Sequence, residues 1–318
     1  MIRVPIHVPY GRLAVVLIIA LILIPMIVGL PLKVQAAAGE KKGAPRTSYR
    51  FSYTPIYQFE TDLESGGRFD VKRHFLRFAI TRIIDRNWAV GIGLRFDYEN
   101  WNFSGIKELA GAELWNKLYR PGISFPIFYT TNKNWRFGII PAVELAGASG
   151  AETDKSLSYG AVLSAAYVFG PDLVLGLGGG IFERLEQTEG FPYVVVDWKI
   201  NEQWQLTNPF RAGPVGPAGL ELIYKPTSRW ETGIGGAYRS YRFRLDDSSA
   251  VADGIGEVDF WAAFIRVGRQ LGDHYRLDIN GGALMDGSIT IEDEDSNKLG
   301  QTDYDTALFT GLTLKGQW

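Results

Sequence analysis

The sequence predicts an all-β protein: a transmembrane antiparallel up-and-down β-barrel of about 14 strands, with 12 strands as the alternative. Three observations predict this fold. Segments of about ten residues alternate between apolar and polar side chains, short turns are followed by an aromatic residue, and long polar connections alternate with the short turns. Successive side chains of a strand point to opposite faces, so this alternation is expected where one face meets lipid and the other meets water.

The first 36 residues have the features of a secretory signal peptide. Arg3 and Arg12 precede an almost uninterrupted apolar run over 13–30, and small residues follow at 36–38, where a signal peptidase could cut. A run of this length could also cross a bilayer as a helical anchor, since about 20 apolar residues are enough. Pro25 and the small residues favour cleavage.

Residues 37–47 are expected to form a periplasmic linker, and 48–318 the barrel. Without the first 36 residues the chain keeps 30 basic and 35 acidic residues, so it is mildly acidic. Proteins that bind nucleic acid cluster Lys and Arg on one face, so no nucleic-acid partner is expected. The chain has no cysteine, which fits passage through an oxidising periplasm.

The segment 88–101 shows the alternation most clearly. One register is apolar and consists of Trp88, Val90, Ile92, Leu94, Phe96 and Tyr98. The other register is small or charged and consists of Ala89, Gly91, Gly93, Arg95, Asp97 and Glu99. Comparable alternation recurs over 49–60, 119–129 and 135–145, which predicts that polar and small residues share the inner face.

Six short turns each precede a new strand. They lie at 85–87, 132–134, 170–172, 201–203, 227–229 and 272–274. Leu173 follows one of them, and an aromatic residue follows each of the others: Trp88, Trp135, Trp204, Trp230 and Tyr275. These aromatic residues predict a girdle at one membrane interface. A soluble β-sandwich would also alternate, but it has no need of an aromatic residue after nearly every turn.

Seven longer polar connections separate the remaining strand pairs, at 61–70, 102–117, 148–155, 185–190, 211–215, 244–255 and 287–304. Six turns and seven loops join 14 strands and place both chain ends on the periplasmic side. The strands are expected to begin near 48, 71, 88, 118, 135, 156, 173, 191, 203, 217, 230, 256, 275 and 305. Prolines shorten the two strands predicted between 203 and 226. If these two strands are not counted, the barrel has 12 strands.

Two of the longer connections carry features of their own. In the second, Leu109, Leu114 and Trp115 suit a short amphipathic helix that either caps the surface or folds into the barrel mouth. In the seventh, the acidic run 292–295 departs from the calcium-binding EF-hand pattern, because Lys298 stands where that pattern needs Gly. This loop is therefore expected to be solvated and to hold no metal.

The last strand, 306–318, places Leu308, Leu312, Leu314 and Trp318 on one face. At this point the chain resembles the bacterial outer-membrane β-barrel superfamily, whose members usually end in a strand with a terminal Phe or Trp. The resemblance covers roughly 48–318. It implies location in the cell outer membrane, Trp318 as an assembly signal, and as partners the barrel-assembly machinery, outer-membrane lipids and lipopolysaccharide. A homo-oligomer is compatible with it.

Charged side chains of both signs fall in the polar register. On the lipid face an Arg or Lys would cost about 2–4 kcal/mol at the midplane, so these side chains are expected inside. The candidate pore-lining residues are Arg77, Arg95, Asp97, Glu99, Arg120, Arg136, Glu144, Glu221, Arg239 and Arg276. They form either a network of ion pairs that holds the wall or an eyelet that selects solutes by size and sign. Inward glycines such as Gly176 and Gly178 favour a water-containing lumen.

Enzymes built on outer-membrane barrels mostly place a His beside a Ser or Asp. Beyond the leader the chain has only His74, expected near the outer end of the second strand, and His274, expected in a periplasmic turn. The two are too far apart to share a site. The glycine-rich 176–180 lies inside a strand and begins no helix, so it is no dinucleotide fingerprint. No catalytic residue and no cofactor are expected.

The expected function is therefore that of a porin-like passive channel for small hydrophilic solutes. The alternative is a closed structural or surface-binding barrel without transport. An envelope-lipid-modifying enzyme is the third hypothesis.

Overall fold

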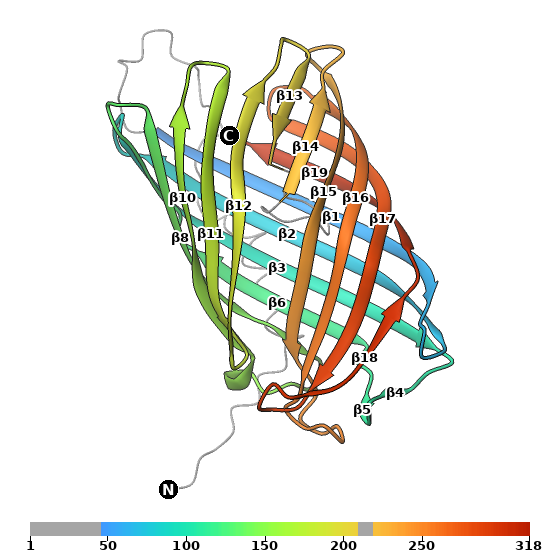
Figure 1. The fold of residues 1–318 in the computed structure, drawn as a ribbon. Coiled ribbons are helices and arrows are strands. Elements are labelled where there is room, and N and C mark those ends of the chain that lie inside the picture. The colour runs from blue at the N-terminus through green and yellow to red at the C-terminus, as the bar shows by residue number, and fades with distance from the viewer. Residues whose placement is uncertain (1–45, 209–218) are drawn as a thin grey trace, which may run out of the picture.

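The computed structural model describes residues 46–208 and 219–318 (Figure 1). They form a closed antiparallel barrel of 14 strands, as the sequence predicts. β1 (Arg46–Asp62) closes the barrel by pairing with β19 (Ala307–Gln317). In these residues no helix is long and apolar enough to cross a membrane. The expected signal peptide and nearly all of the expected linker lie outside the described residues, but β1 begins two residues earlier than predicted.

The strands between them follow in chain order: β2 (Arg68–Ile83), β3 (Trp88–Ser104), β4 (Glu108–Leu109), β5 (Ala112–Glu113), β6 (Lys117–Ser124), β7 (Ile127–Thr130), β8 (Trp135–Leu145), β9 (Gly147–Ala148), β10 (Leu157–Val168), β11 (Leu173–Arg184), β12 (Gln187–Lys199), β13 (Trp204–Thr207), β14 (Gly219–Tyr224), β15 (Trp230–Arg244), β16 (Ile255–Leu271), β17 (Tyr275–Glu292) and β18 (Lys298–Tyr304). Three barrel strands are interrupted and consist of β6 with β7, β8 with β9, and β18 with β19. A single 3₁₀ turn, Asp154–Ser156, precedes β10.

The predicted strand starts agree with the structure within four residues for every strand but the last. The last strand begins early, at Lys298, because β17 and β18 extend their hairpin through most of the predicted loop 287–304. The predicted loop 185–190 is likewise a tight turn. Leu185 and Glu186 adopt positive φ angles there, as in a two-residue type I′ turn.

Several periplasmic turns contain a side-chain-to-backbone hydrogen bond that positions the aromatic residue of the next strand. In four of them a side-chain oxygen accepts hydrogen bonds from two backbone N–H groups, one of which belongs to the Trp that begins the next strand. Asp85 Oδ1 accepts from the N–H of Trp88 at 2.8 Å, and Asn201 Oδ1 accepts from that of Trp204 at 2.9 Å. Such a local bond stabilises the turn and fixes where the strand starts. The girdle Trp and Tyr residues are 38–46% exposed on the outer surface.

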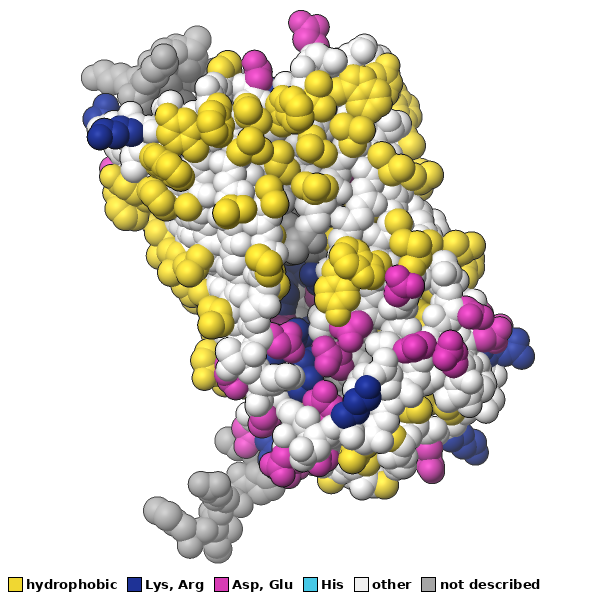
Figure 2. All heavy atoms as spheres, in the orientation of Figure 1, with side chains coloured by type: hydrophobic (Ala, Val, Ile, Leu, Met, Phe, Trp, Pro, Cys, Tyr) yellow, Lys and Arg dark blue, Asp and Glu magenta, His cyan; other side chains and the backbone are white. Residues whose placement is uncertain are grey.

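A second row of aromatic rings crosses the barrel exterior nearer its outer end. Tyr53, His74, Tyr98 and Tyr119 lie on four neighbouring strands, with adjacent ring centroids 6.1, 5.9 and 5.4 Å apart. The hydroxyl of Tyr53 is 2.8 Å from Nδ1 of His74. His74 therefore faces outward, within the second girdle. Figure 2 shows apolar side chains over the upper part of the exterior and charged ones over the lower part.

The outer end of the barrel is pinched. β9 leaves β10, pairs with β6, and meets β15 through a parallel bridge between Gly147 and Arg244. A narrower ring of strands is thereby closed inside the wider one. The tip of the β11–β12 hairpin packs against the outward side of β15, where Arg184 donates to the carbonyl oxygen of Ser240 at 3.4 Å.

In the part of the chain that the structure describes, the ladder is interrupted beside this hairpin. β13 pairs with only three residues of β12, and β14 pairs with β15 only as far as Ala237. Among the described residues no ladder joins the remaining edges of β12 and β15, which separate in Figure 1 and border a cleft in Figure 2. Pro192 of β12 fits such an edge, because proline donates no ladder hydrogen bond.

The outer mouth of the narrow ring is filled by packed aromatic side chains. Trp115 lies 4.5 Å from Phe243, 5.6 Å from Trp101 and 5.7 Å from Phe103, measured between ring centroids. The expected helix in this loop is wrong. The loop forms the β4–β5 hairpin instead, with positive φ at Ala110 and Gly111, and its Trp115 enters the mouth rather than capping the surface.

Candidate functional site: the charged lumen

The structure places all ten candidate pore-lining residues on the inward register of their strands, and it gathers nine of them into two clusters. Whether these residues line an open pore stays a prediction. Arg136 lies apart near the periplasmic end of β8, is exposed, and forms no ion pair within 46–208 and 219–318.

The first charge cluster extends over β2, β3, β6, β8 and β15. It comprises Arg73, Arg77, Arg95, Asp97, Glu99, Arg120, Glu144 and Arg239. Arg77 pairs with Asp97, Arg95 with Glu144, and Arg120 with Glu99. The guanidinium groups of Arg120 and Arg239 also lie over the ring of Tyr241, with their central carbons 3.9 and 4.9 Å from its centroid.

The second charge cluster lies on β14–β17 and β19. It comprises Glu221, Glu231, Arg266, Arg276, Asp278 and Lys315. Arg266 is central: it pairs with Glu221 at 2.5 Å, with Glu231 at 2.7 Å and with Asp278 at 3.1 Å. Three carboxylates around one guanidinium tie together four strands of the wall.

Arg73, Arg266 and Lys315 are absent from the predicted set. The alternation of apolar and polar residues nevertheless indicates an inward position for Arg266 and Lys315. Arg266 alternates with the apolar Ile265 and Val267, and Lys315 is the single charged residue of β19, in the register opposite Leu314. A strict count of alternation along β16 and β19 would have found both.

The inward glycines do not leave space for water in the way the sequence suggested. A Cβ at Gly122 would lie 2.8 Å from Nε of Arg95, and one at Gly235 would lie 2.9 Å from the ring of Phe264. Gly178 and Gly180 are similarly covered by the rings of Tyr193 and Phe191. Side chains from neighbouring strands occupy the space that the glycines vacate, because cross-strand pairs lie close together on one face of a sheet.

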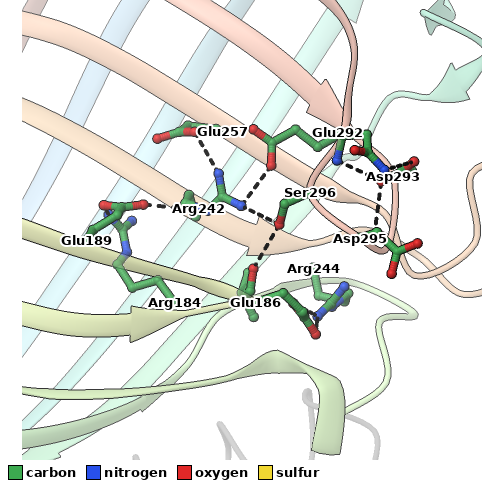
Figure 3. A network of polar contacts seen from close by, with 12 residues as sticks. Arg184, Glu186, Glu189, Arg242, Arg244, Glu257, Glu292, Asp293, Asp295 and Ser296 are labelled. Atoms are coloured by element: carbon green, nitrogen blue, oxygen red, sulfur yellow. Dashed lines mark hydrogen bonds and ion pairs between the residues drawn. The ribbon is translucent and has the colours of Figure 1, made fainter.

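A third charge cluster, drawn in Figure 3, holds the pinch together. It comprises Arg184, Glu186, Glu189, Arg242, Arg244, Glu257 and Glu292. Arg242 lies 2.9 Å from Glu257, 2.8 Å from Glu292 and 3.6 Å from Glu189. The tip of the β11–β12 hairpin is thereby tied to β15, β16 and β17.

Several side chains of the acidic run 292–295 form contacts within the protein. Glu292 belongs to the third charge cluster, and Glu294 lies 3.6 Å from Nζ of Lys155. Asp293 caps its own loop by accepting hydrogen bonds from the side chain and backbone N–H of Asn297, which lowers the pKa of its carboxyl. In the part of the chain that the structure describes, no group of acidic or histidine side chains is placed to hold a metal ion.

The two histidines of the described residues and the last residue occupy separate places. His274 is in a periplasmic turn, with Nδ1 3.0 Å from the carbonyl oxygen of Gln317, whereas His74 lies in the outer girdle. Trp318 pairs with the backbone of Tyr49 through two hydrogen bonds, 2.8 and 3.0 Å long, and its ring packs edge-on against Tyr275 at 5.6 Å. Its role in assembly stays a prediction.

Comparison with known proteins gives little beyond general likeness. No family model and no curated protein matches the chain. Among solved structures, an outer membrane channel from Pseudomonas putida F1 is 10% identical, with 90% of this chain and 100% of that chain covered and a TM-score of 0.48. The toluene transporter TodX from Pseudomonas putida is 9% identical (87% and 90% covered, TM-score 0.39), and the outer membrane protease OmpT from Escherichia coli is 8% identical (88% and 99% covered, TM-score 0.27). Values this low carry no argument about function.

The class of the protein follows from its own geometry. Large apolar side chains in the middle of strands face outward and are 60–71% exposed, as at Leu177, Ile234 and Ile265, whereas charged side chains fill the interior. A soluble barrel or sandwich has the opposite distribution. With its closed ladder and two aromatic girdles, the chain has the architecture of a transmembrane β-barrel.

Proposed function

We propose that the protein is a passive outer-membrane channel for small hydrophilic solutes. The supporting observation is the periplasmic half of the lumen, where inward positions carry exposed polar or charged side chains, among them Arg50, Arg136, Asp197 and Lys199. Such a surface attracts water and small ions into the barrel. Burial of these side chains would instead be expected if the interior were packed from end to end.

In this proposal, the described arrangement is the closed state of the channel. At the outer mouth, Trp115 of the second loop is 5% exposed and packs against Trp101 and Phe243. Solute flow through the mouth requires this loop to move, because packed aromatic rings leave no path for a hydrated solute. The loop that carries Trp115 is therefore the gate of the proposed channel.

The test is single-channel conductance of the purified barrel in a planar bilayer. Replacing residues 106–115 with a short Gly-Ser linker should raise conductance or open time above that of wild type, because it removes the gate. Trp261→Ala removes a Trp that is 51% exposed on the exterior, so it should leave conductance unchanged. Heat-modifiable gel migration reports whether each variant folds.

A closed structural barrel is the second candidate, and a specific observation favours it. Glu99 and Arg73 are each 1% exposed, so the outer half of the interior contains ion pairs that exclude water. If wild type and the folded loop-replacement variant both fail to conduct, the structural barrel is correct and the channel is not.

A further inference from the structure

The strand register gathers guanidinium groups in the first charge cluster. Arg77 of β2 pairs in register with Arg95 of β3, so these two cations lie directly opposite each other on the inner face. Arg120 of β6 lies one diagonal step away, two residues along from the Gly122 that pairs with Arg95. Like charges that lie opposite or diagonal on neighbouring strands repel each other, so this arrangement calls for compensating negative charge.

A fourth guanidinium group reaches the same place from β15. Arg239 donates from Nε and Nη2 to the hydroxyl oxygen of Tyr241, both at 3.3 Å. The central carbons of Arg239 and Arg120 lie 4.9 and 3.9 Å from the centroid of the Tyr241 ring, so this one ring contacts both cations. Arg95 is also close enough to Arg239 for their charges to interact. The four guanidinium groups therefore converge.

These cations exceed the carboxylates that neutralise them. The first charge cluster contains five arginines and three carboxylates. Glu99 is shared by Arg73 and Arg120, and Arg239 forms no ion pair within 46–208 and 219–318. Counted over the described residues, the cluster therefore carries two positive charges more than its own acids balance.

Part of this positive charge is buried without a hydrogen-bond acceptor. The side chain of Arg120 is 4% exposed, and its Nε and Nη1 have no acceptor among the described residues. The ring of Tyr241 attracts the cation but offers no lone pair to its N–H groups. Buried charged donors that lack an acceptor are costly, so an anion that reached them would be stabilised.

The cluster is accessible from the periplasmic half of the lumen. The side chains of Arg95 and Arg77 are 38% and 33% exposed, whereas that of Asp97 is 5% exposed. The next inward positions towards the periplasm carry small side chains, at Ala79, Gly93 and Ser124. An anion that enters the lumen from the periplasm therefore meets guanidinium groups before it meets Asp97.

We propose that the first charge cluster binds one small divalent oxyanion, held by Arg95, Arg120 and Arg239. A dianion matches the surplus of two positive charges, and guanidinium groups present forked donors to its oxygen atoms. Guanidinium groups donate hydrogen bonds but accept none, so a fully deprotonated oxyanion such as sulfate fits better than hydrogen phosphate. The inference rests on the proposed function only for a role in transport, since binding itself requires no conduction.

Binding is tested by calorimetric titration of the detergent-solubilised barrel at constant ionic strength, with sulfate, hydrogen phosphate and nitrate as probes. Sulfate should bind saturably, with one ion per barrel, and at least tenfold more tightly than nitrate, which carries a single charge. Hydrogen phosphate should bind more weakly than sulfate. Absence of saturable sulfate binding, equal affinity for nitrate, or tighter binding of hydrogen phosphate would overturn the proposal.

Two substitutions in the cluster should change sulfate affinity in opposite directions. Arg239→Gln removes a cation without leaving a carboxylate unpaired, and it should weaken sulfate binding at least tenfold. Glu144→Gln frees Arg95 and increases the positive surplus, so it should tighten sulfate binding at least threefold. The matched control is Arg269→Gln, which removes an exterior cation that packs on Trp230 and should leave sulfate affinity unchanged.

Equal loss in the Arg239 and Arg269 variants, or no gain in the Glu144 variant, would overturn the proposal. Heat-modifiable gel migration of every variant excludes misfolding as the cause.

Reversal potentials across a salt gradient give a second readout in conducting protein. Wild type should prefer anions, and Arg239→Gln should reduce that preference; unchanged selectivity would count against Arg239 as part of the anion site. Sulfate binding without conductance in wild type and in the loop-replacement variant would refute the channel but leave this site standing. Conductance without sulfate binding would refute the site and leave the channel standing.

Discussion

At the scale of single residues, the interior is governed by the cost of burying charge. Glu99 is 1% exposed and lies between the guanidinium groups of Arg73 and Arg120. A buried ion pair is weak evidence of net stability, but loss of one partner leaves an uncompensated charge. The carboxylate of Glu99 is therefore needed mainly because its two neighbours are already buried.

We predict that Glu99→Gln destabilises the folded barrel by about 3–5 kcal/mol, since it leaves two buried guanidinium groups facing each other. Urea-induced unfolding in lipid vesicles, followed by tryptophan fluorescence, measures this change. Arg136→Ala is the control and should alter the free energy of unfolding by less than about 0.5 kcal/mol, because its side chain is exposed. Equal stability of the two variants would contradict this account.

At the scale of elements, each strand is placed by its own turn and then fixed by its neighbours. Side-chain oxygens in the periplasmic turns hold the next Trp at the membrane interface, as Asn201 does for Trp204. The end of β19 is placed by the backbone pairing of Trp318 with Tyr49 and by the packing of the Trp318 ring on Tyr275.

Deleting Trp318 should consequently leave secreted protein unfolded in the periplasm, because closure of the barrel loses both contacts. Cell fractionation and heat-modifiable gel migration measure the outcome. Trp318→Phe should assemble normally, since it keeps an aromatic ring at the girdle. Normal outer-membrane yield of the deletion variant would show that the final aromatic residue is dispensable.

At the scale of the whole molecule, the pinch divides the barrel into a packed outer end and a wetter periplasmic end. Arg242, with three carboxylates from β12, β16 and β17, ties the β11–β12 hairpin to the narrow ring. These groups come from strands far apart in the sequence. Their contacts depend on the curvature of the wall, which places β15 against the hairpin.

Arg242→Met should release the tip of the hairpin while the rest of the barrel remains folded. Hydrogen exchange of the amides in 184–190 should become at least tenfold faster, because the hairpin loses its ties to β16 and β17. Arg269→Met removes an exterior cation that packs on Trp230 and should leave this segment unchanged. Unaltered exchange in the Arg242 variant would mean that apolar packing, not the third charge cluster, holds the pinch.

The sequence by itself determined the strands, the turns, the girdle of Trp88 and its counterparts, and the inward register of residues such as Arg95 and Glu221. These features are local: alternation is set within one strand by contact with lipid or water, and turns are set by a few consecutive residues. The contact of β9 with β15, the entry of Trp115 into the mouth and the burial of Glu99 were decided by the tertiary structure alone. Each depends on how strands distant in sequence curve towards one another, which alternation along a single strand does not specify.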